Sequence, residues 1–111
     1  MELKTETDGK RLTIYLRGEL DHHAAGRLRE EIDAAAVRVN ANELVLDFTE
    51  LGFMDSSGIG LILGRYKRMT ARGGTLRVCG AGERLLRVMQ MAGLGSLGIL
   101  QKGEDWRESG K

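Results

Sequence analysis

Three polar residues, Asp55, Ser56 and Ser57, stand where an apolar strand pattern changes to an apolar helix pattern, within the stretch LGFMDSSGIGLILGRYK. Residues of these types cap helix N-termini, because a side-chain oxygen accepts from backbone N–H groups that lack a partner within the helix. Capping alone does not require two adjacent hydroxyls after an acid, with Gly58 directly behind them. An exposed hydroxyl here also tolerates a phosphate, since the helix dipole and the free N–H groups favour an anion. The junction is therefore the predicted functional feature of the chain.

A hydrolytic triad is the sharpest chemical alternative at this junction, because Ser56, Asp55 and either His22 or His23 supply its residue types. A triad also needs a hydrogen-bonded base and an oxyanion hole, and the sequence lacks the G-x-S-x-G nucleophile elbow. We therefore predict no catalytic residue and no enzyme. The two histidines are adjacent, so their side chains point in different directions and do not predict a metal site.

A glycine-rich segment, Gly80-Ala81-Gly82, follows a predicted strand and precedes a predicted helix, as phosphate-binding loops do. It lacks the third glycine of G-x-G-x-x-G and the lysine of a P-loop. A tight helix entry is therefore favoured over a nucleotide site, and no cofactor is expected.

Composition limits the class of partner. The 111 residues fit one domain, and the formal net charge of +1 gives no electrostatic reason for nucleic acid or an anionic membrane as a direct partner. No apolar run approaches the roughly 20 residues that a membrane helix needs, and no signal-peptide core is recognisable, so we expect a cytoplasmic protein. The single cysteine, Cys79, lies in an apolar strand pattern and is predicted to be a buried structural thiol.

The periodicity of apolar residues predicts an α/β fold with a small mixed sheet, an N-terminal hairpin and three helices packed on the sheet. The hairpin turns at Asp8-Gly9, and Asp21 caps the first helix. Residues 1–101 form the domain, and 102–111 a polar tail that is frayed or weakly helical. In chain order, the expected elements are strands 3–7 and 11–17, helix 22–39, strand 43–48, helix 57–72, strand 75–79, helix 83–92 and strand 97–100.

The three strands that precede helices are expected to be parallel, because a helix that joins two strands makes a βαβ unit. Their carboxyl ends then lie at one edge of the sheet, where ligands usually bind in open α/β sheets. The loops 18–23, 51–57 and 80–82 converge at this edge. Asp21, Asp55 and Ser56 are therefore expected to share a surface.

The helix after the junction contains three glycines, Gly58, Gly60 and Gly64, each of which costs about 1 kcal/mol relative to alanine in a helix interior. Such a weakness suggests that another backbone approaches the helix closely. Tight packing of the helix on the sheet is the favoured explanation. The alternative is room for a partner protein beside Ser56.

The segment FMDSSGIGLILGRYK, with RGELDHH before it and GGTLRVCG after it, resembles an anti-sigma factor antagonist of the sporulation type in the STAS domain family. The resemblance runs from about Arg11 to Leu97. It implies that Ser56, the first serine after the acid, is phosphorylated by a partner anti-sigma factor serine kinase. A serine phosphatase and, indirectly, a sigma factor are the other implied partners. Ser57 remains the alternative acceptor.

The resemblance implies a switch that works by charge. A phosphate on Ser56 adds about −1.5 to −2 charges beside Asp55, and like charges across an interface cost several kcal/mol. The unphosphorylated chain is expected to bind the anti-sigma factor and release the sigma factor, and phosphorylation is expected to end binding. Besides Ser56, the expected partner-binding residues are Asp21, Asp55, Ser57, Gly58 and Arg65.

Arg65 is included because it lies in the family motif GRYK, where it forms a basic cluster with Lys67 and Arg68. A solvated helix face is the common explanation for such a cluster. The alternative function is a STAS scaffold or regulatory module of a stress-signalling or transport complex, which binds constitutively and has no phosphate cycle.

Overall fold

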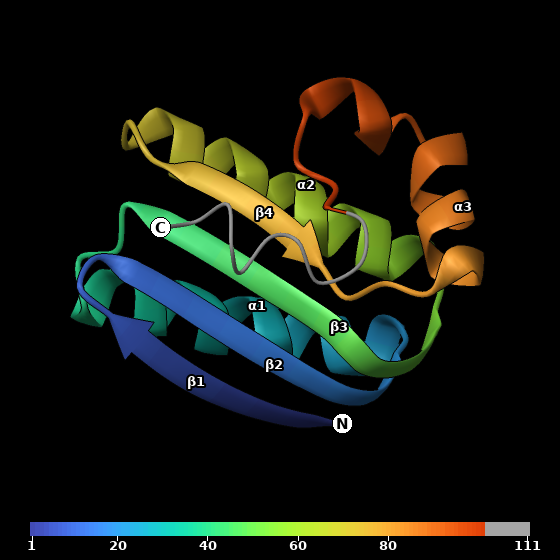
Figure 1. Ribbon diagram of the computed structural model, residues 1–111. Coiled ribbons are helices and arrows are strands. Elements are labelled where there is room, and N and C mark those ends of the chain that lie inside the picture. The colour runs from blue at the N-terminus through green and yellow to red at the C-terminus, as the bar shows by residue number, and fades with distance from the viewer. Residues whose placement is uncertain (102–111) are drawn as a thin grey trace.

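The computed structural model describes residues 1–101, and the predicted tail at 102–111 lies outside the described residues. The chain alternates strands and helices as expected from the sequence (Figure 1). The elements are β1 (Glu2–Asp8), β2 (Arg11–Leu20), α1 (His22–Arg38), β3 (Glu43–Met54), α2 (Ser56–Ala71), β4 (Thr75–Cys79), α3 (Glu83–Met91) and the short 3-10 helix η1 (Leu94–Leu97).

The four strands form one mixed sheet in the order β1-β2-β3-β4. β1 and β2 form the predicted antiparallel hairpin, with Gly9 at a φ of 61° in the turn. β2 and β3, and β3 and β4, are parallel, which confirms the predicted βαβ arrangement. All three helices begin at the edge where the parallel strands end (Figure 1).

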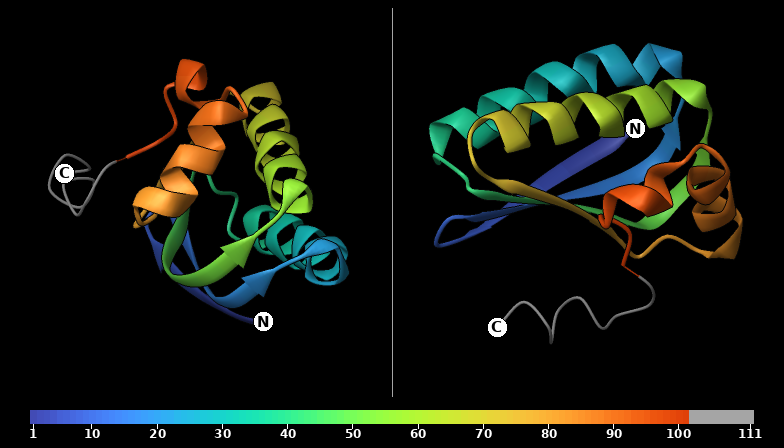
Figure 2. Two further views of the ribbon diagram at one scale, coloured as in Figure 1. Left: turned by 90° about the vertical axis from the view of Figure 1, so that its right-hand side faces the viewer. Right: turned by 90° about the horizontal axis from the view of Figure 1, so that it is seen from above.

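The core lies between the sheet and the pair α1 and α2, which cover one face together (Figures 1 and 2). Alternate residues of β2, Leu12, Ile14 and Leu16, are buried on that face, as a half-buried strand requires. α3 and η1 lie at the end of the sheet and add Leu85, Met89 and Leu94 to the core. Cys79 is buried, as predicted. Among the helices described, none has the length and apolar character needed to cross a membrane.

Two predicted boundaries are wrong for the same physical reason. β2 continues to Leu20 and β3 to Met54, well past the expected ends at 17 and 48. The pairing of β2 with β3 shifts register twice, between Tyr15 and Arg17 and between Gly18 and Glu19, and each shift adds one residue to β3. Such bulges break the two-residue alternation by which a strand is recognised in a sequence.

The predicted last strand at 97–100 is also wrong. The chain instead forms η1, which two glycines in the left-handed region flank, Gly93 at a φ of 88° and Gly98 at 71°. The segment meets the sheet at one isolated parallel bridge between Leu100 and Val78, in which the Ile99 carbonyl accepts from the Val78 N–H and the Gln101 N–H donates to the Val78 carbonyl, both at 2.8 Å. An apolar run interrupted by glycines satisfied the strand pattern, but the positive φ angles curl it into a tight turn.

Candidate functional site

The candidate site lies where β2 and β3 end side by side. Leu20 and Met54 are register partners, and the Asp55 N–H donates to the Leu20 carbonyl at 3.4 Å. Neighbouring strands lie about 4.8 Å apart, so the residues that follow them, Asp21 and Asp55, lie next to each other. The left view in Figure 2 faces this edge of the sheet. The predicted convergence of the Asp21 and Asp55 loops is confirmed.

The cap of α2 holds Ser56 in a defined position. Asp55 has extended backbone, and its Oδ1 accepts from the Ser57 N–H at 2.8 Å. The Gly58 N–H donates to the Asp55 carbonyl at 2.9 Å. Ser56 is the first residue of the helix and is exposed, whereas Ser57 is half-buried. The aspartate therefore serves as the cap and leaves the Ser56 hydroxyl toward solvent.

The cap of α1 has the same design. Asp21 Oδ1 accepts from the Ala24 N–H at 3.0 Å. This hydrogen bond lowers the pKa of Asp21 below its usual range, partial burial opposes the effect, and His23 and His22 lower it further. The two imidazole rings, expected to point in different directions, instead lie 4.0 Å apart, centroid to centroid, in the exposed first turn of α1. The two caps thus present neighbouring carboxylates that hold helix amides.

We expect Asp21→Ala to be less stable than the wild-type chain at neutral pH, because α1 loses its cap. A lowered carboxyl pKa contributes stability above the unfolded value of 3.8, and this contribution is lost as the pH falls through the folded pKa. The stability difference between the two proteins should therefore shrink below about pH 3.8. Urea unfolding between pH 2 and 7 measures it. Asp21→Ser keeps an uncharged cap and should recover stability without that pH dependence, and a pH-independent difference for Asp21→Ala would contradict the assignment.

Gly58 is buried and seats the first turn of α2 on the sheet. A Cβ at this position would lie 2.7 Å from Met54 Sδ and 3.2 Å from Leu20 Cδ2, and closer still to Met54 Cγ. The favoured explanation, tight packing, therefore accounts for Gly58. Gly60 and Gly64 have open space where a Cβ would lie, so room for a partner at these two positions stays a prediction.

A family model described as STAS domain matches residues 2–103. The chain belongs to the STAS domain family.

The relatives of this STAS domain include an anti-sigma F factor antagonist of Paenibacillus polymyxa, 42% identical over 96 residues, which cover 85% of this chain and 82% of that protein. The solved structure of the anti-sigma factor antagonist SpoIIAA in its unphosphorylated form has a TM-score of 0.83 and 30% identity over 99% of this chain and 98% of that one. The phosphorylated form of the Bacillus cell fate determinant SpoIIAA has a TM-score of 0.76 and 30% identity over 96% of each chain. The STAS domain is thus SpoIIAA-like in sequence and in fold.

Arg65 does not lie where the sequence predicted. Its side chain is only 5% exposed and lies between α2 and α1, with Nε 2.8 Å from Asp33 Oδ1. Burial lowers the pKa of Arg65, and the charge of Asp33 opposes this effect. Arg68, on the next turn, remains 57% exposed and reaches Asp33 Oδ2 at 3.4 Å. Arg65 therefore forms a buried ion pair between two helices of the STAS domain, and its side chain offers little surface to a partner in this conformation.

The loop after β4 forms the tight helix entry that the sequence favoured. Thr49 donates to Asp47 Oδ1 through its N–H at 2.9 Å and its hydroxyl at 2.6 Å. Gly80, at a φ of 74°, packs against this pair, and a Cβ there would lie 2.8 Å from Asp47 Oδ1 and 2.9 Å from the Thr49 nitrogen. Only glycine fits such a close approach at positive φ. Gly80 therefore allows the loop to pack closely against β3.

The components of a triad are not assembled. Asp55 is occupied as the cap of α2, and Asp21 as the cap of α1. Within residues 1–101, no hydrogen bond joins the Ser56 hydroxyl to an imidazole. The site has an exposed hydroxyl without an imidazole positioned as its base, so the geometry of a hydrolytic triad is not present within the described residues.

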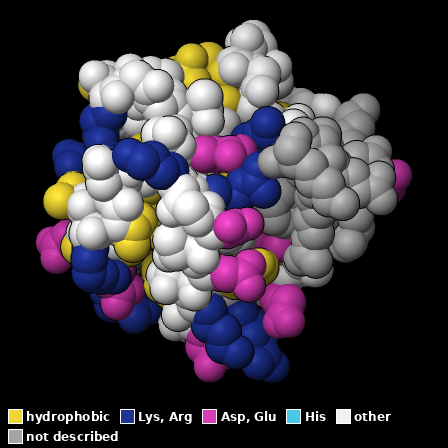
Figure 3. Space-filling model, turned by 60° about the vertical axis from the view of Figure 1, so that its left-hand side comes forward, with side chains coloured by type: hydrophobic (Ala, Val, Ile, Leu, Met, Phe, Trp, Pro, Cys, Tyr) yellow, Lys and Arg dark blue, Asp and Glu magenta, His cyan; other side chains and the backbone are white. Residues whose placement is uncertain are grey.

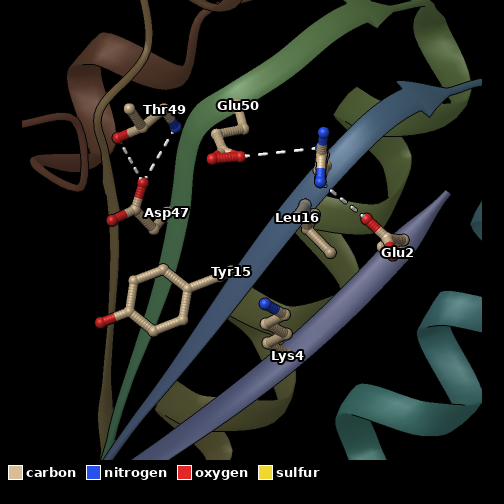
Figure 4. Close-up of a pocket in the computed structure, with 8 residues that line it drawn as sticks. Glu2, Lys4, Tyr15, Leu16, Asp47, Thr49 and Glu50 are labelled. Atoms are coloured by element: carbon tan, nitrogen blue, oxygen red, sulfur yellow. Dashed lines mark hydrogen bonds and ion pairs between the residues drawn. The ribbon is translucent and has the colours of Figure 1, made fainter.

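A hollow of about 360 Å³ lies on the sheet face away from α1 and α2 (Figure 4). Its lining mixes charges, with Lys4 and Arg17 beside Asp47 and Glu50, and Arg17 reaches Glu50 at 3.8 Å and Glu2 at 3.4 Å. None of its lining residues belongs to the caps of α1 or α2. The hollow and the Ser56 surface are separate features of the STAS domain.

The exposure of one residue beside the site was not predicted from the sequence. Phe53 lies two residues before the cap of α2, and 46% of it is exposed. The signal that could have found it is Gly52, because a glycine inside a strand pattern often marks a bulge that redirects the next side chain.

Proposed function

We propose that this STAS domain is an anti-sigma factor antagonist that is switched by phosphorylation of Ser56. The observation that carries the proposal is the exposed Ser56 hydroxyl at the first position of α2, beside a cap whose carboxylate is already engaged. The antagonist of Paenibacillus polymyxa, 42% identical, and the two SpoIIAA forms support it. In the proposed cycle, the unphosphorylated chain binds an anti-sigma factor kinase, the sigma factor is released, and a serine phosphatase restores the free hydroxyl.

The local geometry supports Ser56 over Ser57 as the acceptor. The Ser57 N–H is bound to Asp55 at 2.8 Å, and its side chain is half-buried in the first turn. A kinase needs access to the hydroxyl oxygen, and Ser56 provides it without opening the helix. Ser57 contributes instead through the amide that completes the cap.

The fold is expected to survive the modification. A phosphate at a helix N-terminus gains roughly 0.3 to 1 kcal/mol from the helix dipole, and up to about 2 kcal/mol in good geometry. Both solved forms of SpoIIAA resemble this chain, with TM-scores of 0.83 and 0.76. We therefore expect phosphorylation to change the affinity for the partner and not the fold, because the new charge adds to those of Asp55 and Asp21 at the interface.

Phosphorylation can be tested with the anti-sigma F factor of Paenibacillus polymyxa as the kinase. The chain is incubated with this protein and ATP, and intact-mass spectrometry with fragmentation locates the product. We expect one phosphate on Ser56, none in Ser56→Ala, and full modification in Ser57→Ala. The natural antagonist of that organism is the positive control for kinase activity.

Two results would contradict the proposal. A phosphate on Ser57 alone would transfer the switch to the second hydroxyl. Binding without any phosphate, from a kinase that modifies the control antagonist, would favour a constitutive STAS scaffold, in which the DSSG segment is only a helix cap.

A further inference from the structure

Phe53 is exposed where an aromatic residue is costly. The large apolar residues exposed within residues 1–101 are Val37, Phe53, Val88 and Met91, and Phe53 is the aromatic one among them. It directly precedes Met54, which packs under Gly58, and lies two residues before Asp55. Leaving much of a phenyl ring in water forfeits part of the roughly 1.5 to 3 kcal/mol that its burial contributes. A position so close to Ser56 calls for a physical explanation.

The bulge at Gly52 turns Phe53 outward. On β2, Gly18 and Glu19 are consecutive, but their partners on β3 are Leu51 and Phe53, so Gly52 is the inserted residue. Residues three apart in a regular strand point to opposite faces. Leu51 and Met54 are nevertheless both buried, and Gly52 and Phe53 between them are both exposed. The inserted residue keeps both apolar side chains in the core and places the aromatic ring on the surface, the kind of redirection for which bulges occur beside functional sites.

Acidic residues lie close to Phe53 along the two strands. Glu19 is the register partner of Phe53 and is exposed, and Asp21 and Asp55 follow at the ends of the same two strands. An aromatic group framed by carboxylates complements an apolar pocket with a cationic rim, because charge complementarity orients the approach while the buried ring supplies affinity. On the face of the molecule drawn in Figure 3, basic and acidic side chains are interspersed.

We propose that Phe53 is the apolar anchor through which the anti-sigma factor kinase holds the unphosphorylated chain, in an apolar pocket rimmed by lysine or arginine. This inference rests on the proposed function and extends it, because Phe53 is exposed and lies three residues before Ser56, the first residue of α2. The ring positions the hydroxyl for the kinase, and the phosphate then adds negative charge at the margin of the same contact. The partner is a protein surface, and neither nucleic acid nor lipid is invoked.

The test measures binding of the anti-sigma F factor of Paenibacillus polymyxa to the wild-type chain and to variants by titration calorimetry. Phe53→Ala should bind at least about 30-fold more weakly, as expected for a central aromatic contact. Phe53→Leu keeps apolar volume and should fall between. Val37→Ala removes an apolar side chain that is more exposed than Phe53 (63% against 46%) and lies near the C-terminal end of α1. It is the control, with an expected change within about 2-fold.

A second variant keeps the test independent of the fold of Phe53→Ala. Glu19→Lys reverses one charge beside the ring and should slow association and alter its salt dependence. Phosphorylation kinetics give a further readout. If Phe53 acts by binding, Phe53→Ala raises KM for phosphorylation and leaves kcat near the wild-type value.

The outcomes distinguish failure of the proposed function from failure of this inference alone. If the wild-type chain does not bind, the proposed function and this inference fail together. Wild-type binding with an unchanged Phe53→Ala affinity overturns the inference alone, as does an equal loss in Val37→Ala. A selective loss in Phe53→Ala and a slower association of Glu19→Lys, with both variants melting like the wild-type chain, would support the anchor.

Discussion

We expect Ser56→Asp to bind the anti-sigma factor about 100-fold more weakly than the wild-type chain, and Ser56→Ala to bind as tightly as the wild-type chain. The carboxylate adds a negative charge beside Asp55, and Asp21 lies at the neighbouring strand end. Like charges brought together in a desolvated interface cost several kcal/mol, and about 2.7 kcal/mol corresponds to 100-fold. Calorimetric titration of both variants with the anti-sigma F factor of Paenibacillus polymyxa measures the difference.

Stability separates this effect from unfolding. Aspartate at the first turn of a helix interacts favourably with the dipole, so Ser56→Asp should melt at or slightly above the wild-type temperature. Ala34→Asp adds the same charge at an exposed position in the C-terminal half of α1 and should leave affinity unchanged. If Ser56→Asp and Ser56→Ala bind equally well, the switch does not work by charge.

The position of the site could be predicted because it depends on topology. The sequence predicts three strands from two-residue alternation, each followed by a helix, and this order places the ends of β2 and β3 at one edge of the sheet. The hydrogen bond from the Asp55 N–H to the Leu20 carbonyl confirms that the two ends are adjacent. The caps were also readable, since aspartate before a helical pattern has one common role. Asp21 and Asp55 therefore followed from local sequence combined with a single rule about parallel strands.

The detail of the surface could not be predicted because it depends on register. β3 has two inserted residues relative to β2, and the sequence of β3 does not show where both insertions lie. An inserted residue reverses which side chains face the core. From the sequence, Phe53 was consequently not distinguished from the other apolar residues before the helix, although 46% of it is exposed in the structure.

Arg65 was misplaced for a different reason. Arginine beside Lys67 and Arg68 has the pattern of a solvated helix face, and the residue that draws it inward, Asp33, is 32 positions away on α1. Helical spacing assigns residues to a face but does not say which charged residue will meet a counter-charge on the neighbouring helix. That information appears only when α1 and α2 pack together.

The ion pair has a large expected effect on stability. We expect Asp33→Ala to lower the free energy of unfolding by about 3 kcal/mol, because it leaves the guanidinium of Arg65, 5% exposed, without its counter-charge. The remaining contact, from Nη1 to the Leu61 carbonyl at 3.5 Å, is long and does not replace it. Urea unfolding followed by circular dichroism gives the value.

The destabilisation should depend on the presence of Arg65. Arg65→Met removes the buried charge and keeps much of the volume, so Asp33→Ala should cost far less in that background, and the double-mutant cycle measures the coupling. Arg68→Ala is the matched control, because its side chain is 57% exposed and its pair with Asp33 contributes at most about 1 kcal/mol. Equal losses for Asp33→Ala and Arg68→Ala would show that burial of Arg65 does not need the carboxylate.

Phosphorylation gives this variant a second readout. Asp33 and Arg65 join α1 and α2 well along both helices, whereas Ser56 is held by the Asp55 cap at the first turn. The folded fraction of Asp33→Ala should therefore accept phosphate at the wild-type rate although its stability is reduced. A lower rate in fully folded protein would instead mean that the packing of α1 against α2 sets the position of Ser56. The ion pair between Asp33 and Arg65 would then contribute to phosphorylation as well as to stability.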